Sequence, residues 1–238
     1  MMEVQFAVAK IGKYATSESG DTLEMIERPH GGLSFVLVDG QRSGKSAKAI
    51  SNLVARKAIQ LLSEGVRDGA AARAAHDYLY TYRAGKVSAT LNMLSADMET
   101  KTFVVSRNNE SAVIVYTEQA GLFLLDEPSR CVGVHRNTKP VITELPILPG
   151  TIIVVFTDGL RHAGSLSGNG SYDPIAATRQ MICDEGITAA RPLADRLLAE
   201  ANEKDNGRPR DDISVLVVSV QPVNPKDDVR RMDVSLPI

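Results

Sequence analysis

The feature that most constrains this chain is a run of apolar residues that ends in an aspartate and a glycine. It occurs at residues 34–40 (SFVLVDG) and 151–159 (TIIVVFTDG), and in mirror order at 210–218 (RDDISVLVV). Apolar, β-branched runs bounded by a turn signal are typical of buried strands. A carboxylate at the open end of such a strand is held rigidly and can face a ligand. The pattern therefore predicts that the fold brings three aspartate-bearing strand ends together.

Length and composition predict one large domain at residues 1–220, followed by a C-terminal extension at 221–238. The extension is open to three interpretations: a weakly packed segment, an edge element or a partner-binding segment. The net charge of -2 gives no general electrostatic reason for binding nucleic acid or an anionic membrane. No apolar run is long enough to span a bilayer, and the N-terminus lacks a signal-peptide pattern. We therefore expect a cytoplasmic protein with no nucleic-acid or membrane partner.

Periodicity predicts an α+β fold with helices packed on sheet faces. Strands are expected at residues 3–11, 22–27, 34–40, 87–97, 102–107, 112–118, 122–125, 141–145, 151–156 and 212–220. Helices are expected at 47–61, 68–82, 174–184 and 191–203. The strands between 87 and 156 follow one another too closely for crossover helices, so neighbouring strands should pair antiparallel. There is enough antiparallel strand for two sheets.

Three connections carry local expectations of their own. The sequence Ser19-Gly20-Asp21 has the composition of a hairpin turn between the first two strands. Asp68 is expected to cap the second helix. The glycine- and serine-rich segment 161–172 is expected to form a mobile flap.

The aspartates point to metal chemistry. Carboxylate and water oxygens are the ligands of Mg²⁺ and Mn²⁺, and two such ions about 4 Å apart can activate water and bind phosphate oxygens. Asp39 fits the bridging position, Gly40 would let a backbone carbonyl approach an ion, and Asp158 and Asp211 could complete the site. The competing interpretation is structural, because Asp-Gly is a common turn dipeptide and aspartate often caps helices. The pattern occurs three times, each time on a strongly predicted strand, which favours a metal site over a purely structural role.

Four motifs, taken in order, resemble a known family. They are Val38-Asp39-Gly40, residues 89–97 (ATLNMLSAD), residues 149–160 (PGTIIVVFTDGL) and residues 211–215 (DDISV). Together they resemble the metal-dependent PPM (type 2C) protein serine/threonine phosphatases, in the bacterial SpoIIE-type branch, over about residues 6–220. The resemblance implies a four-layer α/β/β/α sandwich, with two central antiparallel sheets flanked by helices.

The resemblance also implies a site and an activity. Asp39 would bridge two Mn²⁺ or Mg²⁺ ions, the Gly40 carbonyl would contact one, and Asp158 and Asp211 would be the remaining ligands. Asp21 resembles an acidic position that acts through metal-bound water, and Asp212 would orient Asp211. The implied reaction is hydrolysis of phosphoserine or phosphothreonine on a protein, without a phosphoenzyme. A STAS-type anti-sigma-factor antagonist is the candidate substrate.

The loop after Asp39 departs from the family pattern. The SpoIIE-type branch usually continues with Met-Gly-His-Gly, where this chain has Gln41, Arg42, Ser43 and Gly44. Arg42 is a candidate contact for the substrate phosphate, or a solvated side chain. Gln41 replaces a histidine of the eukaryotic type, so the sequence identifies no general acid. The metal ligands are retained, which favours an active enzyme.

Two other functions remain open at this point. Residues 35–46 imitate a nucleotide-binding P-loop with Gly44-Lys45-Ser46, but the spacing from Gly40 to Gly44 is one residue too short for that motif. The closely spaced strands also disfavour the parallel sheet of a P-loop fold. The other alternative is a catalytically inactive phosphatase fold that acts as a binding or sensing module, suggested by the altered loop and the unexplained C-terminal extension.

Overall fold

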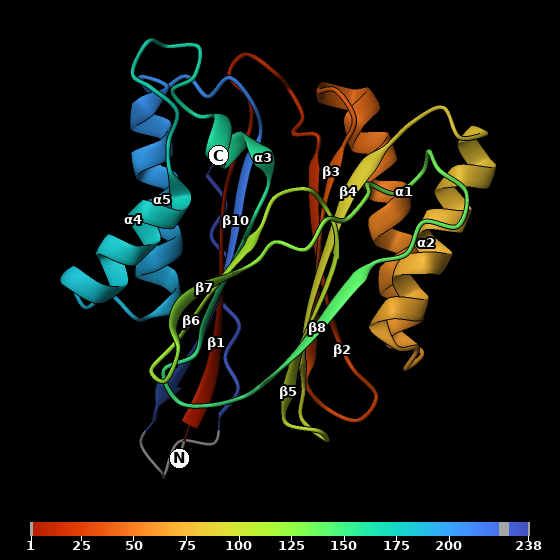
Figure 1. Ribbon diagram of the computed structural model, residues 1–238. Helices are drawn as coiled ribbons and strands as arrows, with labels where there is room; N and C mark the ends of the chain where they lie inside the picture. Colours follow the sequence, from red (N-terminus) through yellow and green to blue (C-terminus); the bar gives the residue numbers. More distant parts are fainter. Residues whose placement is uncertain (1, 224–228, 238) are drawn as a thin grey trace.

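Two antiparallel sheets, stacked face to face, form the centre of the computed structural model, which describes residues 2–223 and 229–237. Helices cover the outer face of each sheet, so the order of layers is helix, sheet, sheet, helix (Figure 1). This is the four-layer α+β architecture expected from the sequence.

The first sheet has the strand order β1-β10-β9-β6-β7. Every neighbouring pair in it is antiparallel. The strands are β1 (Met2–Ile11), β10 (Ile213–Pro222), β9 (Ile152–Phe156), β6 (Val113–Thr117) and β7 (Gly121–Leu125). The first and last strands of the chain therefore lie side by side, and both β9 and β10, which carry predicted site aspartates at their ends, are interior strands.

The second sheet has the order β2-β3-β4-β5-β8, and its neighbouring strands are also antiparallel. The strands are β2 (Asp21–Glu27), β3 (Leu33–Gly40), β4 (Ala89–Asp97), β5 (Thr102–Asn108) and β8 (Val141–Pro146). All strand pairs in both sheets are antiparallel, which excludes the P-loop alternative because that fold requires a parallel sheet.

The helices form two separate outer layers (Figure 1). On the second sheet lie α1 (Gly44–Ser63) and α2 (Asp68–Arg83). On the first sheet lie α3 (Asp158–His162), α4 (Pro174–Arg179), the π-helical turn η1 (Gln180–Asp184) and α5 (Ala190–Lys204). The predicted helix at 174–184 is thus a short α-helix that continues as a π-helical turn.

The apolar core has three parts, because each sheet is buried on both faces. Along β3, Phe35 and Leu37 face the other sheet, whereas Val36 and Val38 face α1 and α2. A third cluster fills the space between the first sheet and α5. Burial on both faces explains why the strands are continuous apolar runs without polar alternation.

Two local expectations are wrong. β1 pairs with β10 and β2 pairs with β3, so the segment 12–20 connects the two sheets and is not a hairpin turn. Asp68 is not the N-cap of α2, because Arg67 occupies that position and Asp68 is the first helical residue. The side chain of Asp68 is buried and forms an ion pair with Arg28 (3.1 Å). The Asp68 side chain therefore pairs with Arg28 in the interior and does not cap α2.

The C-terminal extension lies only partly within the described residues, since residues 224–228 and 238 fall outside them, as does residue 1. β10 runs to Pro222, just beyond the expected domain boundary. Residues 229–237 are exposed and contain no assigned strand, and Arg230 forms an ion pair with Glu27 (2.8 Å). None of the helices described in residues 2–223 has the length and apolarity needed to cross a membrane.

Candidate metal centre

Strand register places the first two acidic residues of the site next to each other. Asp21 at the start of β2 lies opposite Asp39 near the end of β3, and Asp39 lies opposite Thr90 on β4. The Asp39 backbone N–H donates a hydrogen bond to the Thr90 hydroxyl (3.3 Å). Directly opposed side chains in a sheet are immediate neighbours, so Asp21 and Asp39 face the same end of the sandwich.

The other two acidic residues come from the first sheet. Asp158 begins α3 just after β9, and Asp211 lies just before β10, the strand that pairs with β9. A cleft of about 390 Å³ joins the ends of the two sheets, and Asp39, Asp158 and Asp211 all line it. The structure therefore brings together the three aspartates predicted from the strand-end pattern.

The electrostatics of the cleft show how close these carboxylates are. Burial raises the pKa of Asp39 to about 9, with further increases from Asp21, Asp158 and Asp211. Burial and Asp158 also raise the pKa of Asp211, against the hydrogen bond that Asp211 accepts from the Asp212 backbone N–H (2.9 Å). Carboxylates with raised pKa values in a shared cleft repel one another, and a bound cation would remove that repulsion.

Asp21 is the most buried member of the site, with no exposed surface. Its Oδ2 accepts hydrogen bonds from the hydroxyls of Ser214 (2.6 Å) and Thr157 (3.0 Å). Its Oδ1 has no hydrogen-bond partner among the described residues. Burial raises the pKa of Asp21 to about 7, although these two hydroxyls and Lys10 oppose the increase. A buried carboxylate oxygen without a partner is the kind of atom that a cation, or water bound to one, would satisfy.

The donor set fits a hydrated divalent cation. Among residues 2–223 and 229–237, no three Asp, Glu, His or Cys side chains are placed so that together they could hold a metal ion. Mg²⁺ in proteins usually keeps several water ligands and takes only one or two carboxylates, so a complete protein cage is not required. The clustered carboxylates and the unpartnered oxygen of Asp21 could supply the protein ligands of such an ion, and the cleft leaves room for its water ligands.

Both Asp-Gly glycines are required for packing. A Cβ atom on Gly40 would lie 2.1 Å from the backbone oxygen of Ala47 in α1, and one on Gly159 would lie 2.1 Å from the backbone oxygen of Asp212. Each glycine thus lets a neighbouring backbone approach the strand end. The contact of the Gly40 carbonyl with an ion stays a prediction.

The loop after Asp39 forms one wall of the cleft. Arg42 lines the cleft and has a positive φ of 78°, a backbone conformation that non-glycine residues seldom adopt. The Gln41 side-chain oxygen accepts a hydrogen bond from the Ser88 backbone N–H (3.2 Å), so this side chain ties the loop to the segment before β4. Lys45 and Ser46 lie exposed in the first turn of α1.

Sequence reasoning missed several residues of the site. Lys13, Thr90 and Cys131 also line the cleft. Lys13 reaches it from the connection between the sheets, and no sequence signal marks that position. Asp212 holds the same connection in place, because its carboxylate accepts hydrogen bonds from the backbone N–H groups of Lys13 (2.9 Å) and Gly20 (2.7 Å). Asp212 acts on Asp211 through its own backbone N–H, which donates a hydrogen bond, and through its negative charge, which raises the pKa of Asp211.

Comparison with known proteins agrees with this geometry. The family model for stage II sporulation protein E (SpoIIE) matches residues 29–221. The chain belongs to the SpoIIE family. No curated protein matches the sequence of this SpoIIE-family chain.

Solved structures show that this SpoIIE-family chain has the PP2C phosphatase fold. The PP2C domain of SpoIIE from Bacillus subtilis, solved with a fragment of its regulatory domain, superimposes with a TM-score of 0.78 at 17% identity. That match covers 94% of this chain and 65% of the SpoIIE chain, so this chain spans about two thirds of it.

Two further structures contain metal ions according to their descriptions. RsbX in complex with magnesium has a TM-score of 0.68 at 14% identity, covering 93% of this chain and 100% of that one. The catalytic domain of the serine/threonine phosphatase PstP, in complex with two manganese ions, has a TM-score of 0.66 at 16% identity, with coverage of 93% and 100%. At identities this low, these superpositions establish the shared fold alone.

Proposed function

We propose that this SpoIIE-family protein is a metal-dependent phosphatase that hydrolyses phosphoserine or phosphothreonine in a protein substrate. The observation that carries the proposal is the environment of Asp39. Its burial and its three acidic neighbours all raise its pKa, even though Lys13 and Arg42 line the same cleft. Such an arrangement is costly for folding unless a cation binds there, so the cleft is best explained as a metal site.

In the proposed site, Asp39, Asp158, Asp211 and the Gly40 carbonyl would hold two Mn²⁺ or Mg²⁺ ions. Asp21 completes the site through its unpartnered oxygen, and the hydroxyls of Thr157 and Ser214 fix its orientation. The chemistry that bound divalent cations supply is a lowered pKa for water and compensation of phosphoryl charge.

Two cationic side chains are available for the substrate phosphate. Both Arg42, which follows β3, and Lys13, which follows β1, line the cleft. A guanidinium binds phosphate oxygens in a bidentate manner, and an ammonium binds them as a point charge. We assign both residues to substrate phosphate binding.

The proposed physiological substrate is a phosphorylated STAS-domain protein of the anti-sigma-factor antagonist type. Resemblance to the SpoIIE-type branch supports this choice. We further propose that residues 1–220 form the phosphatase domain and that residues 221–238 are a C-terminal extension, whose first two residues complete β10.

The deciding experiment is Mn²⁺-dependent hydrolysis of para-nitrophenyl phosphate and of a phosphothreonine peptide. Wild-type protein should hydrolyse both, and Asp39→Asn should lose about 1,000-fold or more in kcat. The matched control is Asp195→Asn, which changes an exposed aspartate on α5 that pairs only with Arg191.

Calorimetric titration with Mn²⁺ distinguishes an active phosphatase from the remaining alternative, an inactive binding or sensing module. Metal binding by the wild type without any hydrolysis would support an inactive binding or sensing module. Absence of Mn²⁺ and Mg²⁺ binding by the wild type would contradict the proposed mechanism altogether.

A further inference from the structure

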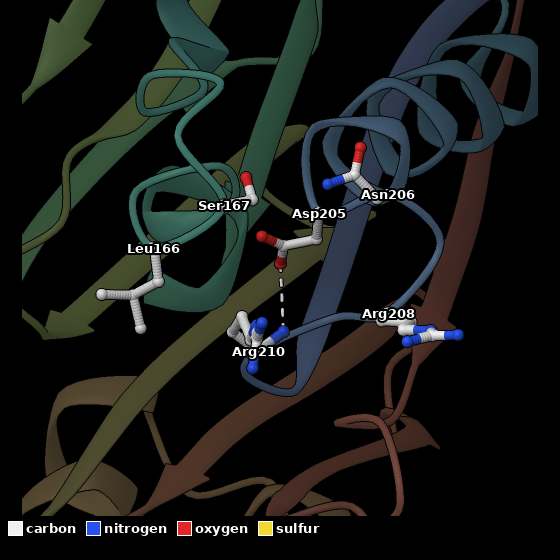
Figure 2. Close-up of a pocket in the computed structure, with 6 residues that line it drawn as sticks. All are labelled: Leu166, Ser167, Asp205, Asn206, Arg208 and Arg210. Carbon is white, nitrogen blue, oxygen red and sulfur yellow. Dashed lines mark hydrogen bonds between the residues drawn. The ribbon is translucent and has the colours of Figure 1, made fainter.

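A second pocket has a volume of about 470 Å³ (Figure 2). It is formed between the segment 163–172, which follows α3, and the loop that leads from α5 to Asp211. The lining residues are Leu166, Ser167, Asp205, Asn206, Arg208 and Arg210. None of them belongs to the proposed metal site, but Arg210 is bonded directly to Asp211, which does.

The two walls of this pocket are hydrogen-bonded to each other. The Ser167 hydroxyl donates to the backbone oxygen of Lys204 (2.6 Å), and the Asn169 side-chain amide donates to the same oxygen (2.9 Å). In return, the Lys204 ammonium donates to the backbone oxygen of Asn169 (3.1 Å). The segment that was expected to be a mobile flap is thus attached to the end of α5, and the pocket is formed before any ligand arrives.

Asp205 organises the floor of the pocket and is itself only 4% exposed. One carboxylate oxygen accepts the backbone N–H of Gly164 (2.9 Å), and the other accepts that of Arg210 (3.0 Å), the contact drawn in Figure 2. Both oxygens are therefore used to hold the walls. The charge that the pocket presents to solvent comes from its two exposed arginines.

The two arginines differ in availability. The Arg208 guanidinium lies over the ring of Tyr14 (5.3 Å) and points away from Leu166 (Figure 2). The Arg210 side chain lies beneath Asp205, and its guanidinium makes no ion pair or hydrogen bond with the described residues (Figure 2). Leu166, on the opposite wall, is 77% exposed. The pocket thus offers one available guanidinium and one exposed aliphatic side chain.

We propose that this pocket binds an acidic side chain of the protein substrate, a few residues from the phosphorylated one. The inference rests on the proposed phosphatase function. Consecutive Cα atoms lie about 3.8 Å apart, so a peptide whose phosphate occupies the cleft beside Asp211 passes Arg210 within a few residues. A guanidinium is the preferred partner of a carboxylate, and Leu166 can pack against the methylene groups of a glutamate.

The test is a set of phosphothreonine peptides in which one glutamate is moved along either side of the phosphothreonine, each paired with a glutamine version. Wild-type protein should prefer the glutamate peptide at one or two positions by about fivefold in kcat/KM, the effect of one exposed ion pair. Arg210→Gln should abolish that preference, mainly through KM, and Arg210→Lys should restore part of it. Arg73→Gln, on the exposed face of α2, should leave the preference unchanged.

Hydrolysis of para-nitrophenyl phosphate separates this inference from the proposed function. The Arg210→Gln protein should hydrolyse this small ester at the wild-type rate, because the ester cannot reach the pocket. Fluorescence anisotropy of the same peptides, which does not require turnover, should show the same preference in wild type and its loss in Arg210→Gln. Equal affinity and kcat/KM for glutamate and glutamine peptides at every position would overturn the inference, even in an active enzyme. A preference in binding without hydrolysis of any ester would uphold the pocket and contradict the phosphatase function.

Discussion

Two carboxylate sites in this protein, a buried one at Asp68 and a partly buried one at Asp39, are built in opposite ways. Asp68, at the start of α2, has its charge fully compensated by an ion pair with Arg28 (3.1 Å) and a hydrogen bond from the Ser95 hydroxyl. Ser95 in turn shares a hydrogen bond with Ser34 (2.6 Å). Asp39 has no such compensation, and its burial and acidic neighbours all raise its pKa.

The contrast separates a structural carboxylate from a functional one. The Asp68 group ties α2 to β2, β3 and β4, and each of its charges has a partner within the chain. The cleft around Asp39 leaves like charges close together, which lowers the stability of the fold unless a carboxylate binds a proton or a cation. Under the proposed function, the protein uses complete pairing where it needs rigidity and incomplete pairing where it needs a ligand.

Removing one acidic charge from the cleft should have the largest effect. We expect Asp158→Asn to lower kcat for para-nitrophenyl phosphate by about 1,000-fold in saturating Mn²⁺, because a metal ligand is lost. Asp68→Asn should retain wild-type kcat when assayed well below its unfolding temperature. Similar losses of kcat in the two folded variants would erase the distinction between the sites.

The second-largest effect should be on stability, at the compensated site. Asp68→Asn leaves Arg28 buried without its counter-charge, and we expect the free energy of unfolding to fall by about 3 kcal/mol in urea titrations. The control is Glu27→Gln, which breaks the exposed ion pair with Arg230 and should cost less than about 0.5 kcal/mol. Equal costs would mean that burial of the Arg28 pair has no energetic consequence.

The metal-free cleft should show the opposite pH dependence from an ordinary paired aspartate. The pKa of Asp39 is higher in the folded protein than its usual 3.8, so the folded state binds more protons above pH 4, and stability falls as pH rises towards 9. In EDTA, the thermal midpoint should decrease between pH 5 and pH 8. Asp39→Asn should flatten this decrease and raise the midpoint at pH 8 by about 4 °C. A midpoint in EDTA that rises with pH in wild type would contradict the assignment.

The smallest effects should come from the cations that line the cleft. We expect Arg42→Gln and Lys13→Gln each to raise KM for a phosphothreonine peptide by about threefold to tenfold, with a smaller change in kcat. Lys57→Gln, which changes a lysine that lies near the Tyr78 ring on the outer helix layer, is the matched control. A loss confined to kcat would assign Arg42 and Lys13 to the chemical step and not to binding.

Much of the fold follows from local sequence. Residues 34–38 and 152–156 were recognisable as strands because both faces of each sheet are buried, which makes the runs continuously apolar. Antiparallel pairing followed from short connections, and α1 followed from its apolar periodicity. The local exceptions are Asp68, where tertiary burial overrode a capping preference, and the 12–20 connection, where turn-like composition could not reveal that the chain changes sheets.

For the candidate site, the sequence by itself determined which residues are predicted to carry the chemistry. Asp39, Asp158 and Asp211 can be recognised from the apolar runs beside them, without knowing which strands pair. Only the tertiary structure decided which groups surround them. The register of β2 on β3 places Asp21 beside Asp39, and the pairing of β9 with β10 gives Asp21 its two hydroxyl donors.

The same limit applies to Lys13, Arg210 and the second pocket. The position of Lys13 depends on contacts between segments about 200 residues apart, such as Asp212 with Lys13 and Gly20. The second pocket depends on contacts such as that of Gly164 with Asp205, which is 41 residues further along the chain. Local propensity carries no information about such contacts, because they are selected by burying both faces of two sheets at once. The sequence predicts the candidate ligands of the site, and the packing of the sheets decides which other residues surround them.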